Sequence, residues 1–359
     1  MPRARSLLVA LVCLATALTG CTTPSPAPPA SNGTDPSPTP GLPGEEAPGI
    51  GEANASTLQA LVEAQVYREG DPEQPRYRIP GTQGHAETVG ILSDLLGSRG
   101  LSVEQERFQV TMDNLGEVNL TNLYGTRDGA GTGEVWLAAH WDSRAWADGT
   151  TGDDCVGVGE PVLGANDGAA GVAVVLHAVE LLPETNLTVR VVLFDGEDQG
   201  CPGTRDGPGY AGTGWAVGST QAAQAATSEE VAAIEALILV DMPGDENVEF
   251  RKEGAGYRAF PALTDLVYGI AHERGAPMFL DEPGPSILDD HRAFLDRGVP
   301  SVDLIHLDDE RGPGQRGVFP STHHTTKDTP ERLSYEAMAQ VSEVVAASVV
   351  ALDEGALAG

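Results

Sequence analysis

A short run of mostly apolar residues, Thr188 to Phe194, breaks into Asp195 and Gly196 and then into two adjacent acidic residues, Glu197 and Asp198. Such a run is typical of a buried β-strand. Ligands and catalytic groups of open α/β sheets gather where strands end, so an acidic pair at this position indicates a functional site. Neighbouring carboxylates can divide the chemistry, because one can bind a metal ion while the other moves a proton. By itself, an acidic turn is more often only solvated.

Four other segments favour a site over a solvated turn, because each places an acid or an imidazole in a comparable position. Most of them follow an apolar strand or begin a helix. The side chains are His140 and Asp142, Asp167, Asp241, and the pair His323 and His324. Nitrogen and carboxylate ligands from several strand ends, with one position open for substrate, suit a catalytic zinc ion. The sequence therefore predicts a metal-dependent enzyme.

Strand-like and helical segments alternate along most of the chain after residue 54. Strands are expected at 103–112, 118–124, 135–139, 188–194, 236–240 and 301–305. Helices are expected at 55–66, 85–96, 169–182, 215–226, 260–272, 288–295 and 330–350. This alternation is typical of a single α/β/α sandwich with a mixed, mostly parallel central sheet, in which the first two strands can pair antiparallel. We expect one catalytic domain at residues 55–352.

The first 54 residues are expected to lie outside this fold. Two arginines precede an apolar segment, Leu7 to Leu18, which is too short to span a membrane and is typical of a signal peptide. It ends in Leu-Thr-Gly-Cys, which resembles a bacterial lipobox, so we expect residues 1–20 to be a lipoprotein signal peptide and Cys21 to be lipidated. The alternative is an ordinary secretory signal. The Pro-, Ser-, Thr- and Gly-rich linker that ends at residue 54 is expected to be disordered.

These features predict an exported protein, anchored by lipid to the bacterial cell membrane, with its catalytic domain outside the cytoplasm. The net charge of −32 argues against nucleic acid as a partner, because phosphate backbones are bound by an excess of Lys and Arg. Cys155 and Cys201 remain after the two N-terminal cysteines, and an even pair in an exported protein is compatible with a disulfide. We expect Asp148 to belong to a solvated acidic loop, and His85 to lie on the surface.

Several motifs in order give the chain a resemblance to a known family. They include HWDSRAWAD, LGANDGAAG, FDGEDQG, WAVGS, ILVDMPGD, ILDDHRAFLDRGVPSVDLI and HHTTKDT. Over roughly residues 55 to 350 the chain resembles bacterial glutaminyl cyclases of the animal type, which are relatives of the zinc-dependent aminopeptidases. The resemblance implies the zinc aminopeptidase-like fold and a zinc cofactor, with one ion expected and two compatible with the ligands present.

The resemblance also implies a role for individual residues. Asp167, Asp198 and His324 match the zinc ligands, although Asp198 stands where many members of the family have Glu. Glu197 matches the general acid/base. Asp241 and Asp289 match acidic residues that hydrogen-bond around the cyclase site. His140 and Asp241 also match the positions that hold a second zinc in the aminopeptidases. Trp215 matches a Trp near the site in bacterial cyclases. His323 stands where cyclases place a Trp that packs on the substrate.

The implied reaction converts the N-terminal glutamine of peptides or proteins to pyroglutamate and releases ammonia. The alternative is an aminopeptidase that uses two zinc ions. Asp289 favours the cyclase, because aminopeptidases tend to have Ser there, whereas His323 disfavours it. A non-catalytic binding lipoprotein is a third hypothesis, but neither the acid/base nor a ligand is missing. The sequence leaves the oligomeric state open.

Overall fold

The computed structural model describes residues 49–112, 114–148, 159–200, 214–307 and 319–357. The predicted lipidation site Cys21 and the predicted disulfide partners Cys155 and Cys201 lie outside these residues. From Glu46 onward the chain forms one compact unit.

The core of this unit is a six-stranded mixed sheet with the strand order β10-β7-β5-β6-β4-β3. Its strands are β3 (Ser102–Met112), β4 (Gly116–Arg127), β5 (Glu134–His140), β6 (Thr188–Phe194), β7 (Ile234–Asp241) and β10 (Ser301–Ile305). β5, β6, β7 and β10 pair in parallel, whereas β3 pairs antiparallel with β4 and β4 pairs antiparallel with β6. The predicted α/β fold is confirmed, including the antiparallel pairing of the first two predicted strands.

The four parallel strands bring the carboxyl ends of four chain segments to one edge of the sheet. β5 lies between β6 and β7, and His140 at its end is in register with Phe194 at the end of β6. Asp241 ends β7 and is in register with Ile305, which ends β10. The residues that follow these strands are therefore neighbours in space, although they are far apart in the sequence.

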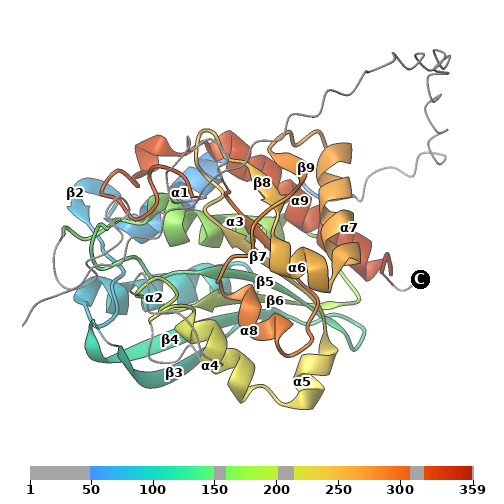
Figure 1. Cartoon of the computed structure of the whole chain (residues 1–359), viewed down its shortest axis with the longest axis horizontal. Coiled ribbons are helices and arrows are strands. Elements are labelled where there is room, and N and C mark those ends of the chain that lie inside the picture. Colours follow the sequence, from blue (N-terminus) through green and yellow to red (C-terminus); the bar gives the residue numbers. More distant parts are fainter. Residues whose placement is uncertain (1–48, 113, 149–158, 201–213, 308–318, 358–359) are drawn as a thin grey trace, which may run out of the picture. The chain divides into compact units, whose positions relative to one another are not determined.

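Helices cover both faces of the sheet, and each layer buries its own apolar cluster. One layer contains α1 (Ala55–Val66), α2 (Gln83–Ser98), α3 (Gly171–Leu181), α7 (Pro261–Glu273) and α9 (Tyr335–Asp353). The other layer contains α4 (Val217–Ala225), α5 (Ser228–Ala233) and α8 (His291–Leu295). Figure 1 shows α1, α3 and α9 on one side of the strands and α4, α5 and α8 on the other. Alternate residues of β5 explain the two layers, because Leu137 packs in the first cluster and Trp136 in the second.

Several predicted helices begin later than the apolar periodicity suggests, because side chains and turns fix their first residues. The last helix begins at Tyr335, since Pro330–Arg332 form a separate 3₁₀ turn and Ser334 caps the α-helix through the backbone N–H of Ala337. Likewise, α4 begins at Val217 rather than at Trp215, because Trp215 pairs with Asp198 in an isolated β-bridge.

Short elements complete the fold at its edges and were not predicted. They are the strand pair β1 (Tyr67–Arg68) and β2 (Asp71–Pro75), the parallel pair β8 (Phe250–Lys252) and β9 (Phe279–Pro283), and the helices α5 and α6 (Gly254–Ala259). They are too short to show a clear hydrophobic period.

Candidate active site

His140, Asp167 and Asp241 meet at the carboxyl ends of β5 and β7. The Nε2 atom of His140 lies 3.1 Å from Oδ1 of Asp167 and 3.4 Å from Oδ1 of Asp241. Its Nδ1 atom lies 3.4 Å from Oδ1 of Asp142. Burial opposes the charged imidazole, but the three surrounding carboxylates more than offset this and raise the pKa of His140 well above its usual value. The side chain is therefore a strong donor toward the acidic groups around it.

Asp167 reaches this point because the chain breaks its helical path just before α3. Asp167 and Gly168 have non-helical dihedral angles, and Gly168 has a positive φ of 101°. A Cβ atom on Gly168 would lie 2.7 Å from the carbonyl oxygen of Asp142 and 3.0 Å from the His140 ring, so only glycine fits there. The Asp328 carboxylate accepts hydrogen bonds from the backbone N–H groups of Asn166 and Asp167 and holds the bend.

The acidic pair after β6 is held by one buried carboxylate. Asp142 accepts hydrogen bonds from the backbone N–H groups of Glu197, at 3.0 Å, and Asp198, at 3.2 Å. Gly196 turns the chain at a φ of 70°, and its close neighbours Leu120 and Met112 leave little space for a side chain. Glu197 remains 8% exposed and Asp198 is 1% exposed. The turn therefore presents both carboxylates toward the interior of the site.

His324 completes a group with Asp167 and Asp198. Its Nε2 atom lies 2.7 Å from Oδ1 of Asp198 and 3.8 Å from Oδ2 of Asp167. The ring of Trp215 lies nearly parallel to the imidazole, with centroids 6.0 Å apart and planes inclined by 13°. His324 adopts a left-handed φ of 55°, which is uncommon for a residue other than glycine and typical of functional sites.

His323 also stacks on the His324 imidazole. The ring centroids of His323 and His324 are 3.6 Å apart with planes inclined by 22°, and Phe319 stacks on His323 at 4.4 Å. A ligand atom of His323 lies within 4.8 Å of those of Asp167 and His324. Nitrogen lone pairs lie in the ring planes, however, so two nearly parallel stacked rings cannot both point at one metal ion. Burial and the neighbouring His324 lower the pKa of His323 well below its usual value, which leaves it neutral.

The donor set fits a cation of the zinc type. Oδ2 of Asp167 and Oδ2 of Asp198 are buried and have no hydrogen-bond partner among the described residues. Burying such oxygens without a partner is costly, so a bound ion or retained protons must compensate. Two carboxylates and one imidazole nitrogen supply the three protein ligands of a catalytic zinc ion and leave a fourth position open.

An acidic cluster lies beside this group, at the start of α8 and on β10. Asp289, Asp290 and Asp303 are buried together, and His291 lies between two carboxylates, 3.2 Å from Glu253 and 3.3 Å from Asp303. Burial and then Asp289 raise the pKa of Glu197 well above its usual value. Burial and then Asp241 raise the pKa of Asp289 to about 7. The site therefore contains carboxyl groups that can hold and release protons near neutral pH.

Two sequence-based expectations are wrong. Asp148 is not solvated but 6% exposed, because its carboxylate receives two hydrogen bonds from Arg144, at 2.7 and 2.5 Å. His85 is buried rather than on the surface, because its Nε2 atom contacts the Asp195 carboxylate at 2.9 Å and its ring stacks on Trp141. Arg144 and Asp328 were not among the predicted site residues. The contacts that bring them to the site, from Arg144 to the Asp198 and Gly200 carbonyls and from the Asn166 and Asp167 N–H groups to Asp328, join segments far apart in the sequence.

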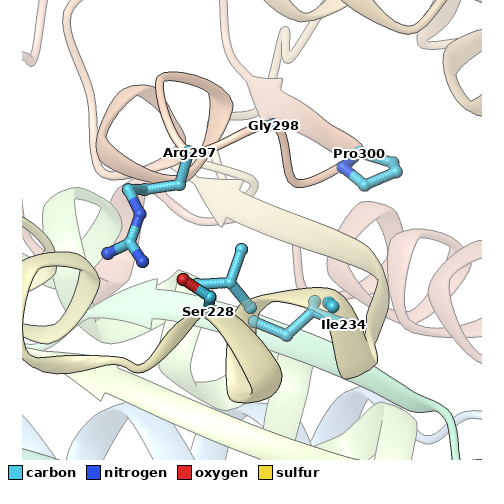
Figure 2. Close-up of a pocket in the computed structure, with 7 residues that line it drawn as sticks. Ser228, Ile234, Arg297, Gly298 and Pro300 are labelled. Carbon is cyan, nitrogen blue, oxygen red and sulfur yellow. The ribbon is translucent and has the colours of Figure 1, made fainter.

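A separate cavity, shown in Figure 2, lies away from these groups. It has a volume of about 430 Å³ and is lined by Ser228, Val231, Ala232, Ile234, Arg297, Gly298 and Pro300. Ile234 begins β7 and Pro300 precedes β10, so the cavity lies at the amino ends of strands whose carboxyl ends carry the acidic and imidazole groups. It is therefore distinct from the candidate active site.

Comparisons with known proteins agree with this geometry. The sequence profile of peptidase family M28 matches residues 122–349, which is more than half of the chain. The mouse glutaminyl-peptide cyclotransferase-like protein is 25% identical over 298 residues, covering 75% of this chain and 70% of the relative.

Two solved structures from Bacteroides thetaiotaomicron superimpose over 84% of this chain and 98% of their own. A glutaminyl cyclase bound to N-acetylhistamine is 27% identical with a TM-score of 0.72. A leucine aminopeptidase precursor is 26% identical with a TM-score of 0.71. The fold is therefore shared by proteins named for two different reactions.

Proposed function

This chain belongs to peptidase family M28, and from that premise we propose that it is a zinc-dependent glutaminyl-peptide cyclotransferase. The observation that carries the proposal is a set of three buried carboxyl groups, those of Glu197, Asp241 and Asp289. They lie beside the metal-binding group of Asp167, Asp198 and His324. Burial raises the pKa of all three carboxyl groups, and for Asp289 to about 7. Cyclisation of a glutamine needs proton transfer from one nitrogen to another, and such groups are suited to that work.

Asp167, Asp198 and His324 would hold the zinc ion, and Glu197 is the neighbouring carboxylate that stays off the metal. When bound, zinc polarises the γ-carboxamide carbonyl of the substrate as a Lewis acid. The substrate is the N-terminal glutamine of a peptide or protein. Trp215 and His323 each stack with the His324 ring, and we expect both side chains to contact the substrate.

Glu197 carries the proton between the two nitrogen atoms of the substrate. Its carboxylate removes a proton from the α-amino group while that nitrogen attacks the γ-carbonyl carbon. A bond forms between the two, and the bond to the side-chain nitrogen breaks. Glu197 then delivers its proton to that nitrogen, so ammonia leaves and the pyroglutamate ring remains. Asp241 and Asp289 share protons with this network and keep the charge of the site low.

An aminopeptidase is the second candidate, and one observation favours it. His140, Asp167 and Asp241 place ligand atoms within 4.8 Å of one another, which suits a second metal ion. In that reaction Glu197 would activate a water molecule for attack on the peptide bond. Asp289 opposes this alternative, because its buried carboxyl, with a pKa of about 7, is suited to sharing protons and belongs to neither of these two metal-binding groups.

Release of ammonia from a short glutamine-initiated peptide tests the proposal. The purified protein is incubated with the peptide, with and without a chelator, and ammonia and free amino acids are measured in the same sample. We expect chelator-sensitive ammonia and a cyclised, otherwise intact peptide. Free amino acids without ammonia would establish the aminopeptidase instead. If neither ammonia nor free amino acids form from any of several peptides, the result would favour a non-catalytic binding lipoprotein.

We also propose that the chain is exported and anchored to the bacterial membrane through lipid on Cys21. The N-terminal positive charges, the apolar segment and the Leu-Thr-Gly-Cys sequence support this proposal. The pair Cys155 and Cys201 is compatible with a disulfide, which would suit an exported location. Fractionation of cells that express the wild-type chain or Cys21→Ser tests the anchor. Wild-type protein in the soluble fraction would contradict it.

A further inference from the structure

The Arg144 side chain connects several parts of the candidate active site. Its guanidinium donates to both carboxylate oxygens of Asp148, and it also donates to the backbone carbonyls of Asp198, at 2.8 Å, and Gly200, at 2.9 Å. It lies over the Trp215 ring, 5.0 Å from its centroid. Only arginine supplies enough donors in one plane for this arrangement. The side chain is 2% exposed, so water does not substitute for these contacts.

Asp148, the main partner of Arg144, lies directly behind His324. Its Oδ1 atom is 3.4 Å from Nδ1 of His324, and its backbone N–H donates to the His324 carbonyl at 3.1 Å. Nε2 of the same imidazole faces Asp198 and Asp167. Nδ1 of His324 therefore faces Asp148, whereas Nε2 faces the other two residues of the metal-binding group. A metal-ligating histidine commonly donates its second N–H to a carboxylate, which fixes its tautomer and ring orientation.

We propose that Arg144 and Asp148 are positioning residues that hold His324 with its Nε2 atom toward the metal and also fix the Asp198 backbone. The inference rests on the proposed function in one respect, namely that Asp167, Asp198 and His324 bind the metal. Neither Arg144 nor Asp148 touches the reacting atoms. Asp148 orients the ring through its carboxylate and holds the His324 backbone through its own N–H, and Arg144 fixes both Asp148 and the backbone of the ligand Asp198. The left-handed backbone of His324 needs such support, because it is unfavourable for a histidine.

The chain contains a matched control pair far from the site. Glu180 contacts Arg99 at 2.7 Å and Nδ1 of His177 at 2.7 Å, so it repeats the contact of one carboxylate with an arginine and a histidine. His177 lies in α3, and its Nε2 atom accepts a hydrogen bond from the backbone N–H of Asn54 instead of facing a metal-binding group. Removing the charge of Glu180 should therefore affect packing without affecting metal binding.

The zinc dissociation constant of the full chain tests the inference. Zinc-free protein is titrated with zinc in competition with a chromogenic chelator, for the wild type, Asp148→Asn and Glu180→Gln. We expect Asp148→Asn to weaken zinc binding by about 10- to 100-fold, as loss of such a partner typically does. Glu180→Gln should bind zinc as the wild type does. Cobalt(II) added in place of zinc should give an altered absorption spectrum in Asp148→Asn only, because the ligand geometry changes.

A second variant and the wild-type protein distinguish failure of this inference from failure of the proposed function. Arg144→Lys retains the charge but loses the forked donors, so it should also weaken zinc binding, and it carries the test if Asp148→Asn does not fold by circular dichroism. Wild-type zinc affinity in both variants would overturn the inference while leaving the proposed function intact. A wild-type chain that binds no zinc would overturn the proposed function and the inference together.

Discussion

The backbone N–H of Glu197 donates to the Asp142 carboxylate at 3.0 Å. The same carboxylate lies 3.4 Å from Nδ1 of His140 and accepts a hydrogen bond from Gln199 at 2.9 Å. Asp142 thus ties the turn after β6 to the end of β5. The Glu197 side chain is left free to face the site, because its position is set through its backbone rather than through its own carboxylate.

Glu197→Gln should abolish most turnover and leave metal binding nearly unchanged. Glutamine has almost the same shape but cannot accept and release a proton, and general acid–base catalysis contributes about 10²- to 10⁴-fold to rates. Ammonia release and zinc content measure the two properties. Glu235→Gln, an exposed change at the start of β7, is the control. Turnover near the wild-type rate would remove Glu197 from the acid/base role.

Asp289→Asn should lower kcat for cyclisation more than it raises KM. The carboxyl has a pKa of about 7, so it can exchange protons with the network at neutral pH, and an amide cannot. Steady-state kinetics with a glutamine-initiated peptide separate the two constants. If Asp289 had a purely structural role, the substitution would change the midpoint temperature of thermal unfolding without lowering kcat more than it raises KM. Unchanged kcat would show that Asp289 takes no part in the reaction.

His324→Ala should abolish zinc binding, whereas the wild type should bind one zinc ion per chain. His324 and Asp198 are in direct contact, so the remaining carboxylates would lack a nitrogen ligand. The expectation of one ion follows from the single ligand group of the proposed cyclase, Asp167, Asp198 and His324. The zinc content of the wild type and of His324→Ala after dialysis tests both expectations. Two tightly bound ions per chain would contradict the single-zinc expectation and favour the aminopeptidase.

The fold was predictable because its signals are local. The bounds of β6, β10 and α1 agree with the predicted 188–194, 301–305 and 55–66, since each has a mostly apolar run or a clear helical period. α1 even begins where the Asn54 side chain accepts hydrogen bonds from Ser56 and Thr57. Parallel pairing followed from the alternation of strands and helices.

The supporting residues of the site were not predictable in the same way. Asp328 holds the Asp167 bend across 161 residues, and Arg144 reaches Asp198 across 54. A single sequence gives no indication of such contacts, because an isolated Asp or Arg is usually solvated. For the same reason Asp148 and His85 were assigned to the surface, although each has a buried partner of opposite charge.

Asp303→Asn should make the stability of the protein less dependent on pH. Asp303 is 1% exposed, and neither of its carboxylate oxygens has a hydrogen-bond partner among the described residues. Burial, then the charges of Asp289 and Glu253, raise its pKa well above the usual value of about 4. His291, 3.3 Å away, is the one side chain in contact with it that can carry a positive charge among those described.

The sign follows from the number of protons bound in each state. Between pH 4 and its raised native pKa, Asp303 keeps its proton in the folded protein but loses it in the unfolded chain. The folded state then binds more protons, so the free energy of unfolding falls as pH rises, by up to about 1.4 kcal/mol per pH unit. Asparagine removes this contribution. The free energy of unfolding in urea is measured at pH 5, 6, 7 and 8 for the wild type, Asp303→Asn and the exposed control Asp94→Asn, all in the same metal state. The slope of this free energy against pH should be shallower for Asp303→Asn alone. Equal slopes would mean that Asp303 is ionised in the folded protein.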